Sequence, residues 1–171
     1  MSHSIFLKVA GVEGEENRSS HEGWIKVDYI DYPFQRYLAG FSGANKNNVG
    51  DADIGKLSVF APIDKAMPTL LKKFLNNTSI DKVTVAWCVS GQETGDTMVI
   101  ELTDARIIGV KFVNNTVGNN SENTSHASQP MSMLYEFVAP KLSVSYTPIS
   151  LDNKINPPVS VRWNVDTQQE D

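Results

Sequence analysis

One stretch of this chain predicts a helix, residues 64–77, which read DKAMPTLLKKFLNN. Its apolar residues recur at the spacing of a single helical face: Met67, Leu70, Leu71, Phe74 and Leu75. Asp64 is a start signal, and Asn76 and Asn77 form a stop signal. Because the rest of the chain reads as strands and turns, we expect the apolar face to seal a β-rich body, with Lys72 and Lys73 facing outward.

Length and composition describe an ordinary globular domain. The chain has 171 residues, of which 40% are hydrophobic and 20% are charged. A chain of this length buries about 70% of its unfolded surface and needs no disulfide or metal to fold. We therefore predict a single domain spanning residues 1–171. Its 15 basic and 20 acidic residues give a net charge of −5, which disfavours nucleic acid as a partner.

The N-terminus does not resemble a signal peptide. The first eight residues, MSHSIFLK, lack a cationic segment, and Lys8 interrupts the apolar run. No later stretch is long and apolar enough to span a membrane as a helix. The sequence therefore predicts a protein made in the cytoplasm without membrane insertion. If the protein is exported, we expect a route that needs no cleavable signal peptide.

Period-two alternation predicts strands on both sides of the helix. In residues 24–32 it places Ile25, Val27 and Tyr29 on one face. Residues 83–89 form a half-buried strand, and residues 98–112 form its hairpin partner, with a bend predicted at Asp104. In total we predict seven or eight strands joined by hairpin-length connections. The fold class is mainly β, either a closed barrel or a sandwich, and we favour a small antiparallel β-barrel flanked by the one helix of residues 64–77.

Three segments are predicted to lie outside this framework. Residues 39–55 are rich in Gly, Asn, Ala, Ser and Asp, and residues 114–129 are rich in Asn. Long connections of this kind within a small domain are either disordered or used for contacts. Residues 166–171 are predicted to be an acidic C-terminal tail.

Catalytic, cofactor and metal sites are not expected. His3, His21 and His126 lie far apart without metal-ligand spacing, so we interpret each as a solvated terminal or loop residue. Cys88 is the one cysteine and lies in an apolar strand, where a structural role is expected. Asp51 and Asp53 suggest a calcium loop, but the acidic residue expected at the twelfth position is Pro62.

Several short segments, taken in order, resemble a known family. These are residues 5–15, 21–27, 55–60, 64–71, 146–148 and 159–165. Together they are similar to the opening, the strand-plus-helix region and the closing strands of the hemolysin-coregulated protein (Hcp) family. The resemblance implies a small β-barrel with a flanking helix that acts as a tail-tube protein of the type VI secretion system. It also implies hexameric rings that stack into a tube, with sheath, spike and effector proteins as partners.

Three functional hypotheses follow from these observations. The first is a structural tube subunit in which the long loop contacts the adjacent ring, through the residues Ala44, Asn45, Lys46, Asn47, Asn48, Val49, Gly50 and Asp51. The second is a stand-alone secreted binding module, or an effector-carrier ring, with the same fold. A small-ligand barrel is a third possibility, and it predicts a monomer with a deep apolar cavity.

Overall fold

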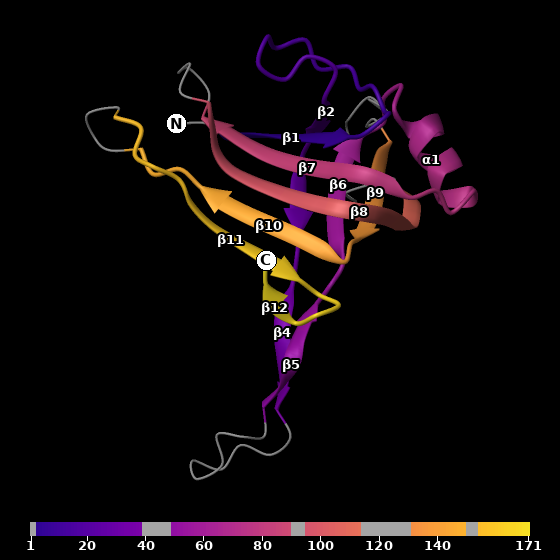
Figure 1. The fold of residues 1–171 in the computed structure, drawn as a ribbon. Coiled ribbons are helices and arrows are strands. Elements are labelled where there is room, and N and C mark those ends of the chain that lie inside the picture. Colours follow the sequence, from indigo (N-terminus) through magenta and orange to yellow (C-terminus); the bar gives the residue numbers. More distant parts are fainter. Residues whose placement is uncertain (1–2, 39–48, 90–94, 114–130, 150–153) are drawn as a thin grey trace, which may run out of the picture.

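The computed structural model describes residues 3–38, 49–89, 95–113, 131–149 and 154–171. In order along the chain (Figure 1), the elements of these residues are β1 (His3–Val9), β2 (Ile25–Val27), β3 (Tyr29–Asp31), β4 (Phe34–Leu38), β5 (Val49–Ile54), β6 (Leu57–Pro62), α1 (Met67–Leu75), β7 (Ile80–Val89), β8 (Asp96–Val113), β9 (Ser132–Val138), β10 (Lys141–Tyr146), β11 (Val159–Asn164) and β12 (Gln169–Glu170).

Ten of the strands belong to one sheet, and its long strand β8 joins two parts of that sheet. One part has the order β12-β11-β10-β8-β7-β1-β2. In the other part, β8 pairs with β9, β9 with β6, and β6 with β3. The ladder between β7 and β8 ends at Ala105, and the ladder between β8 and β9 begins at Arg106. This change of partner directly follows Asp104, where the sequence predicts a bend and where φ is +56°.

The core lies between these two parts of the sheet. The fully buried side chains of β1 and β7 contact those of β6 and β9 within one apolar cluster, which includes Leu7, Val85, Val59, Tyr135 and Phe137. Figure 1 shows β7 and β8 crossing in front of β6 and β9, with α1 at one end. Burial of this cluster supplies the main favourable free energy of folding.

Helix α1 is shorter than predicted because residues 64–66 lead into it as a turn instead of forming its first helical residues. It begins at Met67 instead of Asp64, and the Asp64 carboxylate accepts a hydrogen bond from the Ala66 backbone N–H at 3.0 Å. Pro68 lies in the first turn, where a missing N–H has no consequence. After Asn76, the left-handed residue Asn77 (φ +49°) ends the helix.

The predicted core face of α1 is only partly buried. Leu70 is fully buried, Met67 and Phe74 are half-buried against the core, and Leu71 is half-buried. The prediction is wrong for Leu75, whose side chain is 71% exposed. It lies in the last turn of the helix, beyond the part of the apolar face that the core covers.

A kink at Asp28 divides the strand predicted over residues 24–32 into β2 and β3. β2 pairs with β1, whereas β3 pairs with β6, and the Asp28 N–H donates to the carbonyl of Phe60 at 2.8 Å. The alternation therefore changes phase. Ile25 and Val27 are buried as predicted, but Tyr29 is 53% exposed and stacks on Phe60 with 4.0 Å between ring centroids. The prediction that Tyr29 shares one face with Ile25 and Val27 is therefore wrong.

Two predicted irregular segments contain strands. Residues 49–54 of the expected 39–55 loop form β5, which pairs with β4 in a separate two-stranded sheet. The expected tail of residues 166–171 includes β12, which pairs with β11. Residues 39–48 and the whole of the predicted loop 114–129 lie outside the described residues.

The β-rich fold with one helix is confirmed. Twelve strands are present in the described residues, more than the predicted seven or eight. The additional strands are short or exposed, so hydrophobic alternation does not mark them. Closure of the sheet into a barrel stays a prediction.

Candidate functional site: an exposed ribbon, a surface pocket and a buried histidine

Strands β4 and β5 form a two-stranded ribbon that extends away from the body (Figure 1). We call these residues, Phe34–Leu38 and Val49–Ile54, the β4–β5 ribbon. Its register is irregular between Arg36 and Leu38, and the Arg36 guanidinium donates to the Gly50 carbonyl at 2.7 Å. The ribbon contacts the C-terminal segment through Gln168, whose amide donates to the Ala52 carbonyl at 3.4 Å.

The β4–β5 ribbon exposes apolar side chains. Tyr37 is 78% exposed, and Phe34, Leu38 and Val49 are also exposed. All five residues of β4 are exposed, so neither face of this strand belongs to the core. Exposed apolar groups that cluster on one element are characteristic of a protein interaction surface.

The residues predicted to stack one ring on the next are divided between described and undescribed parts of the chain. Val49, Gly50 and Asp51 are the first three residues of β5 and are exposed. Residues 44–48, comprising Ala44, Asn45, Lys46, Asn47 and Asn48, lie outside the described residues. The part that is described therefore belongs to an exposed strand instead of the predicted loop.

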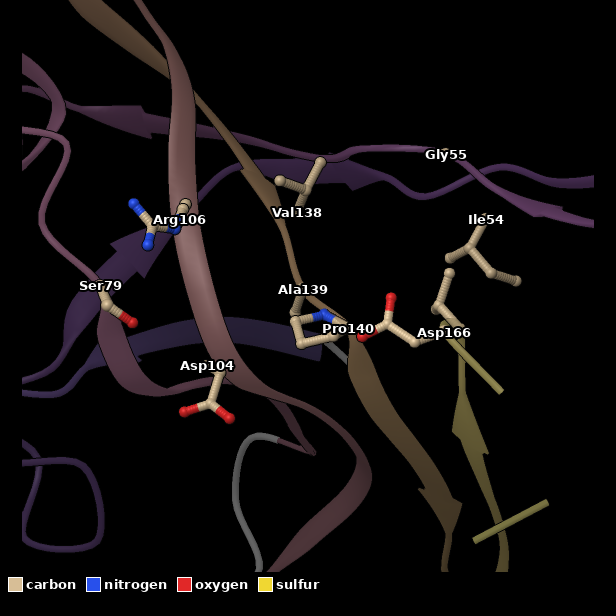
Figure 2. A pocket seen from close by; sticks show the side chains of 10 residues that line it. Ile54, Gly55, Ser79, Asp104, Arg106, Val138, Ala139, Pro140 and Asp166 are labelled. Atoms are coloured by element: carbon tan, nitrogen blue, oxygen red, sulfur yellow. The ribbon is translucent and has the colours of Figure 1, made fainter. Parts of the chain in front are cut away.

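A surface pocket with a volume of about 500 Å³ lies where the ribbon joins the body. Figure 2 shows Ser79 and Arg106 on one side, Asp166 and Ile54 on the other, and Pro140 between them. The lining residues come from segments far apart in the sequence: Ile54, Gly55, Ser79, Asp104, Arg106, Val138, Ala139, Pro140, Val165 and Asp166.

Arg106, a polar residue of this pocket, stabilises one of its walls. One nitrogen of Arg106 donates to the Asn77 backbone carbonyl at 3.0 Å and to its side-chain oxygen at 2.8 Å. The guanidinium thus fixes the turn that follows α1. The remaining polar lining, Ser79, Asp104 and Asp166, contains no histidine or cysteine that would pair with a nucleophile.

The structure corrects the interpretation of His21 as a solvated loop residue. Its side chain is 2% exposed, and both ring nitrogens have partners. Nδ1 lies 2.8 Å from the Ser20 hydroxyl, and Nε2 lies 2.8 Å from an oxygen of Asp96. The ring stacks on Phe6 at 4.4 Å and meets the edge of Trp24 at 4.9 Å. This cluster attaches the segment between β1 and β2 to the start of β8.

Sequence reasoning missed this cluster because Asp96 is 75 positions from His21. The three residue types are those of a hydrolytic triad, but the imidazole is enclosed by two aromatic rings. Ser20, His21 and Asp96 line neither the pocket in Figure 2 nor a smaller one formed by Glu15, Glu16, Lys26, Pro62, Ile63 and Asp64. We assign the cluster a structural role. His3 lies in β1 and is exposed, and His126 is outside the described residues.

Other reactive or metal-binding groups do not converge in the described part of the chain. Burial raises the pKa of the Cys88 thiol, and the nearby Asp96 carboxylate raises it further, so the reactive thiolate is disfavoured. Among described residues, no group of three or more His, Cys, Asp or Glu side chains is placed to hold a metal ion. No helix in the same residues is long and apolar enough to cross a membrane.

Solved structures that share this fold include proteins of the type VI secretion system. A structure described as that of a type six secretion system protein aligns with a TM-score of 0.85 at 16% identity, covering 99% of this chain and all of its own. Hcp1 from Salmonella typhimurium aligns with a TM-score of 0.76 at 16% identity over all of both chains. A type VI secretion system effector from Yersinia pestis aligns with a TM-score of 0.68 at 20% identity, covering 94% of this chain and 99% of its own. These likenesses establish the fold.

The family follows from the sequence itself. The family described as "Type VI secretion system effector, Hcp" matches residues 6–151. No curated protein matches the chain. Because the family match spans most of the 171 residues, the chain belongs to the Hcp family of the type VI secretion system, as the sequence resemblance predicts.

Proposed function

We propose that this protein is a structural subunit of the inner tube of a type VI secretion system. In this proposal one domain forms homohexameric rings, and the rings stack into a tube that is expelled with or around effector proteins. The sheath and the spike are its other partners, and it leaves the cell through the system itself. Membership of the Hcp family supports this function.

The observation that carries the proposal is the exposed β4–β5 ribbon. Tyr37 and Leu38 are 78% and 54% exposed on a ribbon that the body does not cover. A two-stranded ribbon is only marginally stable by itself in water. A closed ring requires two different surfaces that fit each other on neighbouring copies, and a projecting apolar ribbon supplies one of them.

Light scattering coupled to size exclusion tests the ring directly. We expect a mass six times that of the chain at micromolar concentration. A monomer at every concentration would contradict the proposal. Electron micrographs of the same sample should show rings, and under conditions that favour stacking they should show short tubes.

The predicted stacking role of residues 44–51 has its own test. Deleting residues 44–48 leaves β5 intact, because β5 begins at Val49. We expect this variant to form rings that no longer stack. The matched control is Lys111→Ser, which alters an exposed residue of β8 outside the ribbon. Tubes formed by the deletion variant would show that these residues do not mediate stacking.

The alternative function is a stand-alone secreted binding module or an effector-carrier ring. Rings that never stack would favour this alternative. Neighbouring genes for a contractile sheath and a spike would favour the tube subunit, and their absence would favour the module.

A further inference from the structure

One face of the sheet formed by β1, β7, β8, β10 and β11 turns away from the core. Along β7 and β8, the core residues Val83, Val85, Ile100 and Leu102 occupy alternate positions. Because successive side chains of a strand point to opposite faces, the residues between them form the outer face. Figure 1 shows these strands on the side of the molecule away from β6 and β9.

The strand register aligns the residues of this outer face in two rows across the sheet. The first row is Lys8, Thr84, Glu101, Ser143 and Arg162. The second row is Lys82, Thr103, Lys141 and Asn164. We call these nine residues the basic face. Between its charged residues it carries only small hydroxyl and amide side chains, so the surface is flat and polar.

The charge of the basic face is opposite to that of the chain. It contains four basic residues and one acidic residue, a net charge of +3, whereas the whole chain carries −5. The acidic residue, Glu101, lies 3.6 Å from Lys82 and neutralises it. Lys8, Lys141 and Arg162 are exposed and have no ion pair among the described residues.

Groups of both signs flank this face. At the β11 edge Asp171 lies beside Arg162, and its backbone N–H donates to the Arg162 carbonyl at 3.2 Å. The Arg18 guanidinium donates to the Ser4 hydroxyl at 3.2 Å and lies over the Phe6 ring, at the β1 edge of the same surface. Asp96, the nearby carboxylate, already has His21 as its partner at 2.8 Å. The positive charge of the basic face therefore rests on its own residues Lys8, Lys141 and Arg162.

We propose that the basic face binds a partner protein through an acidic surface. Lys141 and Arg162 attract the carboxylates, and Ser143, Thr84 and Thr103 supply hydrogen bonds to side chains or backbone. Complementary charge of this kind sets the association rate and the choice of partner. In the proposed tube subunit this surface would select acidic effectors, but the binding itself does not depend on ring formation.

The chemistry of the basic face favours protein over nucleic acid. A surface that binds single strands offers aromatic rings for base stacking, and neither row contains an aromatic residue. Trp24, at the edge, is already in contact with Lys8 and His21.

The test measures binding of fluorescein-labelled poly-L-glutamate by anisotropy, at low and at physiological ionic strength. The variant K141E/R162E reverses two charges of the basic face. The control K72E/K111E makes the same change in net charge at exposed residues outside it. Reversing two contacting charges alters the binding free energy by about 1–2 kcal/mol, so we expect K141E/R162E to weaken binding about tenfold or more and the control to change it less than about threefold.

Several results would overturn the proposal. These are equal losses in both variants, wild-type binding by K141E/R162E, or absence of binding by the wild type at low ionic strength. Tighter binding of a DNA duplex than of poly-L-glutamate would assign the face to nucleic acid instead. Circular dichroism verifies folding, and K141S/R162S serves if charge reversal disrupts it. Light scattering on the same samples reports ring formation separately, so failure of the binding proposal is distinguishable from failure of the ring proposal.

Discussion

The body and the β4–β5 ribbon place their apolar side chains in opposite environments. In the body, Phe137, Leu102 and Leu70 are fully buried. In the ribbon, Tyr37 and Leu38 are mostly exposed, although both segments are β-rich and adjoin in the chain. The described residues of the body bury their apolar side chains against one another, whereas those of the ribbon leave apolar surface exposed. The first region accounts for stability, and under the proposed function the second mediates association.

The largest change in unfolding free energy is expected in the body, within helix α1. Leu70→Ala removes a fully buried side chain, whereas Leu75→Ala removes one that is 71% exposed on the same helix. We expect the Leu70→Ala variant to lose about 2–5 kcal/mol of unfolding free energy, because it creates a cavity. The unfolding free energy of the Leu75→Ala variant should change by about 0.5 kcal/mol or less. Urea denaturation compares the two, and equal losses would contradict the assigned helix face.

The next effect concerns His21, which lies in the body but outside the main apolar cluster. His21→Ala leaves Ser20 and Asp96 without the imidazole and uncovers Phe6. We expect a loss of about 1–3 kcal/mol, the usual cost of leaving buried polar groups unpaired. His3→Ala, at an exposed residue of β1, is the control. Equal stability of the two variants in thermal unfolding would show that the cluster is not stabilising.

A pH-dependent effect is expected at Tyr135, which is 1% exposed. Burial raises the pKa of its phenol above the ordinary value of 10, and the charge of Asp64 adds to the shift. Above pH 10 the unfolded chain releases this proton while the folded chain keeps it, so stability falls as the pH rises. Above pH 10, the unfolding free energy of the Tyr135→Phe variant should fall by about 1.4 kcal/mol less per pH unit than that of the wild type.

The same variant has an effect at neutral pH that serves as a check. Among the described residues, the buried Tyr135 hydroxyl has no hydrogen-bond partner. Tyr135→Phe therefore removes an unsatisfied group and should not destabilise the protein at pH 7. Urea denaturation at neutral and alkaline pH measures both effects. Parallel stability curves for the variant and the wild type would show that the phenol does not titrate differently on folding.

The smallest change in unfolding free energy is expected in the ribbon. Tyr37→Ser alters a side chain that is 78% exposed, so the free energy should change by about 0.5 kcal/mol or less. Under the proposed function, the same substitution should reduce assembly as measured by light scattering. A variant that assembles normally but unfolds easily would reverse the roles given to the two regions.

The sequence predicts the body well because its strands carry a periodic signal. Val83, Val85 and Leu102 alternate with polar residues, and the structure pairs these strands as predicted. The helix is also found, since its apolar residues repeat at the helical period. Where one face of a strand or helix is buried against the core, the hydrophobic pattern of the sequence agrees with the structure.

The candidate sites could not be predicted because they depend on exposure or on distant residues. β4 is exposed along its whole length, so no alternation marks it as a strand. Tyr29 leaves the expected face because a kink at Asp28 changes the phase of the pattern. His21 meets Asp96 only in the folded chain. The basic face likewise requires the register of five strands.

The pairing of strand β8 has a consequence for how the protein unfolds. Its first half pairs with β7 and β10, and its second half pairs with β9. Neither part of the sheet can separate without disrupting the same strand, so the body should open as one cooperative unit. Amide hydrogens near Ile100 and Ile107, on the two sides of the bend, should therefore exchange with solvent at similar, slow rates set by global unfolding. The ribbon, which does not pair with β8, should exchange much faster.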